Sequence, residues 1–261
     1  MTLGNRIIHS IARMSRLVLV SLTVLVGVMA ALVAVDRNAE TQALDAFVDT
    51  RVVPIPQIAP HVARLSSLWI GDSFTQGGAA YPRIVCAELG WYCNIDAQGS
   101  TGFVNEGAPE LREFTRRFIE RVPTSAALYK ADLIVIDGGR EDLNTDADEV
   151  TAAMREYLDA ISTAWPDASV VIIVPFRLET EPSYPYSSFL PGIRNVAASF
   201  GATVLDPYAE GWFVGADIPA MVIEDELHPN AQGNSYIAAK LEASLERARV
   251  VAPGTSNGGI G

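Results

Sequence analysis

Three side chains in this sequence of 261 residues have the types and spacing for nucleophilic chemistry. Ser73 stands in SLWIGDSFTQGG, directly after an apolar run, and Asp225 and His228 stand three residues apart in EDELHPNAQG. A serine hydroxyl attacks well only when a base takes its proton, and that base is most often histidine. A carboxylate beside the imidazole orients the ring and stabilises its positive charge. We therefore predict a catalytic triad of Ser73, His228 and Asp225.

The choice of His228 as the base follows by elimination among three histidines. His9 precedes an apolar segment long enough to cross a membrane. His61 lies before the strand that Ser73 follows, and at about 3.3 Å per residue that strand separates the two by roughly 20 Å. His228 remains. Taken alone, Asp225 and His228 also fit an ordinary helix start with two solvated loop residues.

From residue 62 onward the chain alternates between apolar runs and helical patterns. Strands are predicted over 63–70, 91–97, 131–137, 169–176 and 202–207, and helices over 81–90, 111–122, 147–165, 189–201 and 230–250. Continuously apolar strands separated by helices are typical of a parallel sheet covered on both faces. Ligands of such sheets bind beyond the carboxyl ends of the strands, where this sequence has GDS, DAQGSTG and DGGRED. The prediction is an α/β sandwich with its site at that edge.

Two backbone N–H groups at this edge are candidates to stabilise an oxyanion. Attack on an ester carbonyl places negative charge on its oxygen, which needs hydrogen-bond donors. The N–H of Ser73 lies in the turn after the first strand, and Gly99 in DAQGSTG offers an unobstructed N–H after the second. Taken alone, Gly99 fits a tight turn equally well.

The order of these blocks resembles the SGNH (GDSL) hydrolase family. The blocks are GDSF, a glycine after the second strand, GGRED after the third and DELH before the last helix, and they extend over residues 62 to 248. The resemblance implies a flavodoxin-like three-layer α/β/α sandwich and a serine esterase or lipase without a cofactor. It also implies that Ser73 is the nucleophile, that Asp225 and His228 complete the triad, and that Ser73 and Gly99 donate to the oxyanion.

The third block departs from the family pattern Gly-x-Asn-Asp, whose asparagine donates to the oxyanion. Residues 139–142 read Gly-Arg-Glu-Asp, so Glu141 occupies the donor position. An ionised carboxylate only accepts hydrogen bonds and repels a developing oxyanion. Three explanations stay open. Glu141 is protonated and donates, it points away while Arg140 or Asn144 substitutes, or the enzyme is slow or specialised.

We also assign Asp72 and Trp212 to the substrate pocket. Trp212 belongs to one of two aromatic-containing loops, 177–192 and 209–219, that follow predicted strands. Such loops often line pockets, although these two would serve equally well to cover the hydrophobic edge of the sheet. No metal site is expected, because the acidic run from Asp142 lacks the glycine and the final glutamate of a calcium loop.

The N-terminal part of the chain predicts that the protein is exported from the cytoplasm. Residues 17–35 contain no charged side chain, and this segment is long enough for a transmembrane helix. Three arginines precede this segment, so its N-terminal end is expected in the cytoplasm and the rest of the chain outside. A cleaved signal peptide with a secreted product is the alternative. The predicted organisation is a stub and anchor over 1–35, a linker over 36–61, a hydrolase domain over 62–250 and a disordered tail over 251–261.

Charge and cysteine content narrow the function further. The formal net charge of −12 repels nucleic acid, and we exclude a role in binding it. Cys86 and Cys93 are expected to form a disulfide in an oxidising compartment, the alternative being two buried thiols. The sequence thus predicts a membrane-anchored extracytoplasmic serine esterase acting on envelope acyl esters. An acyltransferase or deacetylase for envelope glycans or lipids, and a non-catalytic binding domain, are the alternatives.

Overall fold

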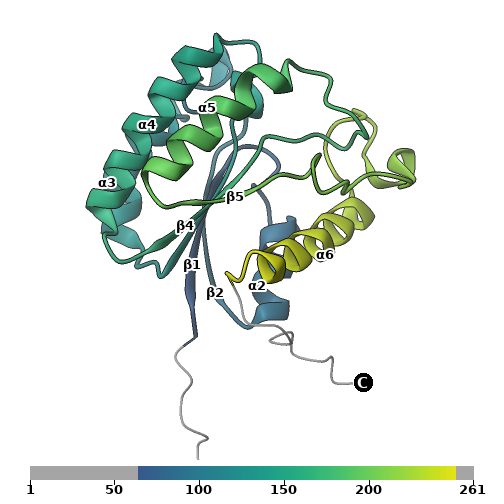
Figure 1. Cartoon of the computed structure of the whole chain (residues 1–261), viewed down its shortest axis with the longest axis horizontal. Helices are drawn as coiled ribbons and strands as arrows, with labels where there is room; N and C mark the ends of the chain where they lie inside the picture. Colours follow the sequence, from purple (N-terminus) through teal and green to yellow (C-terminus); the bar gives the residue numbers. More distant parts are fainter. Residues whose placement is uncertain (1–63, 251–261) are drawn as a thin grey trace, which may run out of the picture. The chain divides into compact units, whose positions relative to one another are not determined.

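The computed structural model describes residues 64–250, which form a parallel sheet between two layers of helices (Figure 1). The strands are β1 (Ser66–Gly71), β2 (Tyr92–Ala97), β3 (Leu133–Asp137), β4 (Ser169–Ile173) and β5 (Thr203–Leu205). All neighbours in the sheet pair in parallel, in the order β2-β1-β3-β4-β5. The predicted α/β sandwich is confirmed.

The helices divide between the two faces of the sheet (Figure 1). They are α2 (Tyr81–Leu89), α3 (Phe118–Leu128), α4 (Ala147–Ala164), α5 (Tyr186–Ser199) and α6 (Ala231–Arg247), with short 3₁₀ turns η1 (Pro109–Leu111), η2 (Arg140–Asp142) and η3 (Ile218–Met221). Helices α3, α4 and α5 cover one face, and α2 and α6 cover the other.

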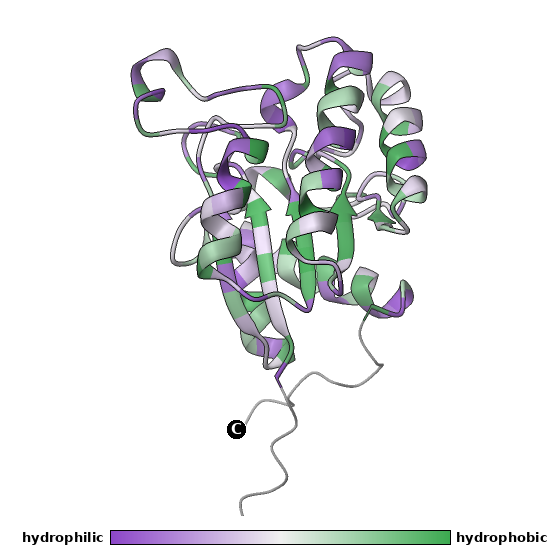
Figure 2. Cartoon of the chain, turned by 90° about the vertical axis from the view of Figure 1, so that its left-hand side faces the viewer, coloured by the Kyte–Doolittle hydropathy of each residue, from purple (hydrophilic) through white to green (hydrophobic). Residues whose placement is uncertain are grey.

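The continuous apolar pattern of the strands follows from this double cover. In β3, Leu133 and Val135 pack into the cluster with α2 and α6, whereas Ile134 and Ile136 pack into the cluster with α3, α4 and α5. All four side chains are fully buried. Successive side chains of a strand point to opposite faces, so a sheet covered on both faces needs apolar residues at every position. Figure 2 shows these hydrophobic strands between the helices.

The strand order reverses direction between β1 and β3. The chain passes from β1 to its outer neighbour β2 and then returns to build β3, β4 and β5 on the opposite side. At such a switch point the loops after the two strands diverge and leave a crevice, where ligands of open α/β sheets bind. Ser73 follows β1 directly, and Arg140 follows β3. The fold therefore brings these two segments to the expected edge.

The predicted helix over 111–122 is wrong in its first half. Helix α3 starts at Phe118, and Phe114, which the helical pattern placed on a buried face, is 73% exposed. The N–H of Arg116 donates to Gln98 Oε1, and the Thr115 hydroxyl donates to the carbonyl of Glu106. Long-range loop contacts therefore hold residues 112–117, and an apolar period alone did not reveal them.

The disulfide prediction is confirmed, whereas the predicted anchor is not covered by the structure. Cys86 and Cys93 are bonded, joining α2 to β2 with their Cα atoms 5.7 Å apart. No helix within residues 64–250 is both long and apolar enough to cross a membrane. The predicted stub and membrane helix (1–35), the linker (36–61) and the tail (251–261) lie outside the described residues.

Candidate active site

The three side chains singled out by the sequence form one hydrogen-bonded chain. His228 Nε2 lies 2.8 Å from Ser73 Oγ, although 155 positions separate the two residues. On the other side of the ring, His228 Nδ1 lies 2.6 Å from Asp225 Oδ2. An imidazole in this position can accept a proton from the hydroxyl while the carboxylate fixes its orientation.

A tight turn holds Asp225 and His228 together. Asp225 Oδ1 accepts the backbone N–H groups of Leu227 and His228, each at 2.9 Å. Hydrogen bonds from the His228 ring and from these two N–H groups lower the pKa of Asp225 to about 2. The carboxylate therefore stays ionised at neutral pH, where it can balance a positive imidazole.

Asn230 anchors this turn to the start of α6. Its Oδ1 accepts the N–H of Gly233 at 3.0 Å and so caps the helix. Its Nδ2 donates to the carbonyls of Ala220 at 2.9 Å and Val222 at 3.0 Å. One side chain thus ties the loop before the turn to the helix after it.

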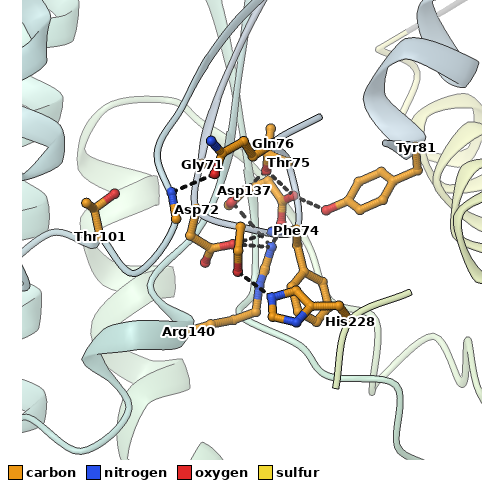
Figure 3. Close-up of polar contacts among 12 residues, drawn as sticks. Gly71, Asp72, Phe74, Thr75, Gln76, Tyr81, Thr101, Asp137, Arg140 and His228 are labelled. Carbon is orange, nitrogen blue, oxygen red and sulfur yellow. Dashed lines mark hydrogen bonds and ion pairs between the residues drawn. The ribbon is translucent and has the colours of Figure 1, made fainter. Parts of the chain in front are cut away.

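A buried ionic cluster lies where β1 and β3 end (Figure 3). It consists of Asp72, Asp137 and Arg140, of which the two carboxylates are fully buried and Arg140 is 6% exposed. Both terminal nitrogens of Arg140 bond Asp137 Oδ1, at 2.9 and 3.0 Å, and Nη2 lies 3.3 Å from Asp72 Oδ1. The N–H of Phe74 donates to the same Asp72 oxygen at 3.0 Å. The backbone on both sides of Ser73 is therefore tied to the cluster.

Hydroxyl groups satisfy the remaining oxygen of Asp137. Thr75 Oγ1 donates to Asp137 Oδ2 at 2.8 Å, and the Tyr81 hydroxyl donates to the same oxygen. Burial raises the pKa of Asp137 to about 6, while the Arg140 charge opposes this rise. The Arg140 guanidinium also lies over the rings of Phe74 and Phe176, at 4.3 and 5.1 Å from their centroids. A desolvated guanidinium in this position gains cation–π attraction.

The loops after β1 and β2 bring Gly99 beside Ser73. The N–H of Gln98 donates to the carbonyl of Gly71 at 3.2 Å. A Cβ placed on Gly99 would lie 3.7 Å from the Cβ of Ser73. The Gly99 N–H donates to the side-chain oxygen of Gln76 at 2.9 Å. Two predicted oxyanion donors are thus neighbours, and one of them already has an acceptor.

Glu141 and Asp142 sit in the short turn after β3. Glu141 is half-buried, and burial, together with the Asp72 carboxylate, raises its pKa. Asp142 is fully buried and accepts the N–H groups of Phe103, Val104 and Asn105 at 2.7 to 3.2 Å. Asp142 therefore fastens the loop after β2 to the turn after β3.

The structure corrects the predicted pocket residues. Asp72 is fully buried, and its Oδ1 bonds the Phe74 N–H and Arg140, so it supports the loop that carries Ser73 and does not line an open pocket. Trp212 is 1% exposed, packs against Phe176 and Phe213, and donates its indole N–H to Ser244 at 3.2 Å. It belongs to the core on the α6 side of the sheet, as the alternative interpretation of its loop expected.

A cavity of about 350 Å³ opens beside the Ser73 hydroxyl. Its lining combines the loop after β1 with the start of α6 and consists of Ser73, Phe74, residues 76–80, His228, Pro229 and Asn234. The wall formed by residues 77–80 carries only glycine and alanine side chains. Small side chains leave room for a ligand next to the hydroxyl.

Sequence reasoning missed the supporting residues Asp137, Thr75, Tyr81 and Gln76. A signal for Asp137 existed, because a carboxylate at the end of a continuously apolar strand must be buried and therefore paired. Thr75 and Tyr81 gave no such signal. Their hydroxyls reach a residue 62 or 56 positions further along the chain, and only the packing of α2 against the sheet shows this.

The fold is an α/β sandwich with a parallel sheet, and a serine, a histidine and an aspartate meet at the switch point of that sheet. Residues 69–236 match the GDSL-like Lipase/Acylhydrolase family, and the chain belongs to this family. It is 25% identical over 189 residues to the GDSL lipase Rv0518 of Mycobacterium tuberculosis, a match covering 66% of this chain and 78% of that protein.

Solved structures of esterases share the fold. Est24, a carbohydrate acetylesterase from Sinorhizobium meliloti, superposes with a TM-score of 0.54 at 14% identity, over 72% of this chain and 100% of that one. Axe2, an acetylxylan esterase from Geobacillus stearothermophilus, gives a TM-score of 0.52 at 17% identity, over 70% and 93% of the two chains. The predicted SGNH (GDSL) resemblance is confirmed by the family match, and the protein is a serine hydrolase acting on esters.

Proposed function

We propose that the protein is a serine esterase that hydrolyses carboxylic esters through Ser73, His228 and Asp225. One observation carries the proposal, namely the unbroken hydrogen-bond chain from Ser73 Oγ through the His228 ring to Asp225. The buried cluster that holds the loop of Ser73 and the open cavity beside the hydroxyl add support, because a nucleophile needs both a fixed position and access for its substrate.

The geometry supports a two-stage reaction. His228 Nε2 takes the Ser73 proton as Oγ attacks the ester carbonyl, and the N–H groups of Ser73 and Gly99 stabilise the oxyanion. His228 then gives the proton to the leaving alcohol, which departs and leaves an acyl group on Ser73. In the second stage His228 takes a proton from water, the hydroxide attacks the acyl group, and Ser73 Oγ recovers the proton as the acid leaves.

The proposed substrate is an acyl ester of the cell envelope with a short acyl group. The cavity of about 350 Å³ beside Ser73 has room for a short acyl group, and the carbohydrate acetylesterases with the same fold support this choice. The uncharged segment 17–35 supports a membrane-anchored enzyme with its hydrolase domain outside the cytoplasm. If a sugar or lipid hydroxyl replaces water in the second stage, the same groups catalyse acyl transfer.

Labelling of the full-length protein in detergent with a fluorophosphonate tests the triad. We expect one equivalent of label on Ser73 in the wild-type protein and none in Ser73→Ala. We expect His228→Ala to be labelled at least about a thousandfold more slowly, because the hydroxyl then lacks its base. A folded wild-type protein that takes up no label would contradict the proposal and favour a non-catalytic binding domain.

A further inference from the structure

A side chain of the protein itself occupies the oxyanion donor on Gly99. Gln76 Oε1 accepts the Gly99 N–H at 2.9 Å, the dashed contact drawn from Gln76 in Figure 3. The two residues come from different loops, 23 positions apart, so this contact is a consequence of tertiary structure. It lies beside the nucleophile, because Gly99 and Ser73 are neighbours.

The group that occupies this donor closely resembles the reacting group of an ester. Only an acceptor can face the backbone N–H of Gly99, so the carboxamide must present its carbonyl oxygen there and not its NH₂. That oxygen is a planar carbonyl acceptor with two lone pairs, as is the carbonyl oxygen of an ester. An ester that reaches the Gly99 N–H must therefore displace Gln76.

The surrounding residues allow the Gln76 side chain to leave while the nucleophile stays in place. Thr75 is fully buried and fixed to Asp137, but residues 76–79 are exposed. Gly77 has a φ of 109°, and a Cβ on either Gly77 or Gly78 would meet no atom within 4 Å. The fixed segment thus ends at Thr75, and the Gln76 side chain that follows it is exposed.

We propose that Gln76 occupies the oxyanion donor of the free enzyme and competes with the carbonyl oxygen of every ester substrate. This inference rests on the esterase function proposed above. In this proposal Gln76 lowers the rate at which the free enzyme captures an ester, because the Gly99 N–H must first lose its bond to Gln76. The expected penalty is about two- to tenfold in kcat/KM, the range that corresponds to one exposed neutral hydrogen bond. Because the contact is the same whatever the substrate, the penalty should not depend on acyl-chain length.

The variants Gln76→Met and Gln76→Ala test the proposal on the full-length protein in detergent. Both remove the carbonyl oxygen, and methionine keeps the length of the side chain. We expect each variant to raise kcat/KM by about two- to tenfold for both 4-nitrophenyl acetate and 4-nitrophenyl butyrate. Fluorophosphonate labelling of Ser73 should accelerate by the same factor, because its phosphoryl oxygen uses the same donors. Gln232→Met, which changes an exposed glutamine on α6, is the matched control and should leave both rates unchanged.

Three results would overturn the proposal. Unchanged rates in labelled Gln76 variants would show that the contact does not compete with substrate, and the triad would stand without it. A lower kcat at constant KM would mean that the carboxamide swings round and donates its N–H to the oxyanion. A gain for the butyrate ester alone would mean that Gln76 only obstructs the acyl chain. Wild-type protein that takes up no label would overturn the proposed function itself, an outcome distinct from these three.

Discussion

The two halves of the candidate active site are held in place in opposite ways. Where β1 and β3 end, the carboxylates of Asp72 and Asp137 and the guanidinium of Arg140 are buried. Opposite them, the side chains of Asp225 and His228 are 42% and 32% exposed. The loop that carries the hydroxyl is thus tied to a desolvated ionic cluster, whereas the imidazole sits on a turn open to solvent.

The difference lies in the range of the contacts. The Asp225 turn is closed by hydrogen bonds between residues two or three positions apart. The buried cluster joins the end of β1 to the end of β3, with Thr75 and Asp137 62 positions apart. Removing a charge from solvent and leaving it unpaired is expensive, whereas loosening an exposed turn is not. We therefore expect damage to the cluster to unfold the protein and damage to the turn to inactivate a folded one.

The largest expected effect is on activity, in Asp225→Asn. The amide can still accept the backbone N–H groups of the turn, but it loses the charge that balances the imidazole and fixes its tautomer. We expect kcat/KM to fall by about 10⁴-fold. Urea denaturation should show that the variant stays folded and loses much less stability than Arg140→Met, because the Asp225 side chain is exposed and no charge is left buried and unpaired. A loss of stability as large as that expected for Arg140→Met would contradict the difference proposed between the exposed turn and the buried cluster.

The next effect is on stability, in Arg140→Met. The variant leaves Asp72 and Asp137 buried without a counter-charge, and breaking such a pair costs about 3–5 kcal/mol. Urea denaturation at pH 7 measures this loss. Arg155→Met, on the exposed face of α4, provides the control and should stay within about 0.5 kcal/mol of the wild-type protein.

The pH dependence of Arg140→Met has a definite sign. Burial already raises the pKa of Asp137 to about 6, and removing the Arg140 charge that opposes this effect raises it further. The folded variant then binds more protons than the unfolded chain, in which the aspartate pKa is about 3.9. Its free energy of unfolding therefore increases as the pH falls towards 5. The variant's loss of unfolding free energy relative to the wild-type protein should be smaller at pH 5 than at pH 7. A loss that is larger at pH 5 would show that the unpaired Asp137 carboxylate does not cause the instability.

The smallest effect is expected for Asn230→Ala. This variant tests whether the Asp225–His228 turn depends on the helix cap that follows it. Loss of a helix cap lowers the free energy of unfolding by about 1 kcal/mol, and the bonds to Ala220 and Val222 are lost as well. Because His228 keeps its own turn, we expect a smaller loss of activity than in Asp225→Asn. Thermal unfolding and ester hydrolysis, compared with Asn195→Ala on the exposed face of α5, measure both quantities. An activity loss equal to that of Asp225→Asn would mean that the turn has no stability of its own.

Local patterns were enough to predict the layers of the fold and the three central side chains. Leu133 to Asp137 could be predicted as a strand buried on both faces, because its continuous apolar pattern depends only on neighbouring residues. Asp225 and His228 were recognisable because three positions in a turn suffice for their contact. His228 could then be matched with Ser73, since parallel strands end at one edge and the chain has few histidines.

Only the tertiary structure decided what surrounds these residues. The pairing of Asp137 with Tyr81, the burial of Trp212, the start of α3 at Phe118 and the contact of Gln76 with Gly99 all depend on segments distant in sequence. The free energy of such contacts comes from packing and desolvation between elements, which no residue pattern within one element encodes. The sequence alone determined the candidate reacting groups and the sheet edge where they meet, because strand periods and turn contacts are local. The packing of loops and helices decided which side chains hold these groups and which bond the backbone beside them.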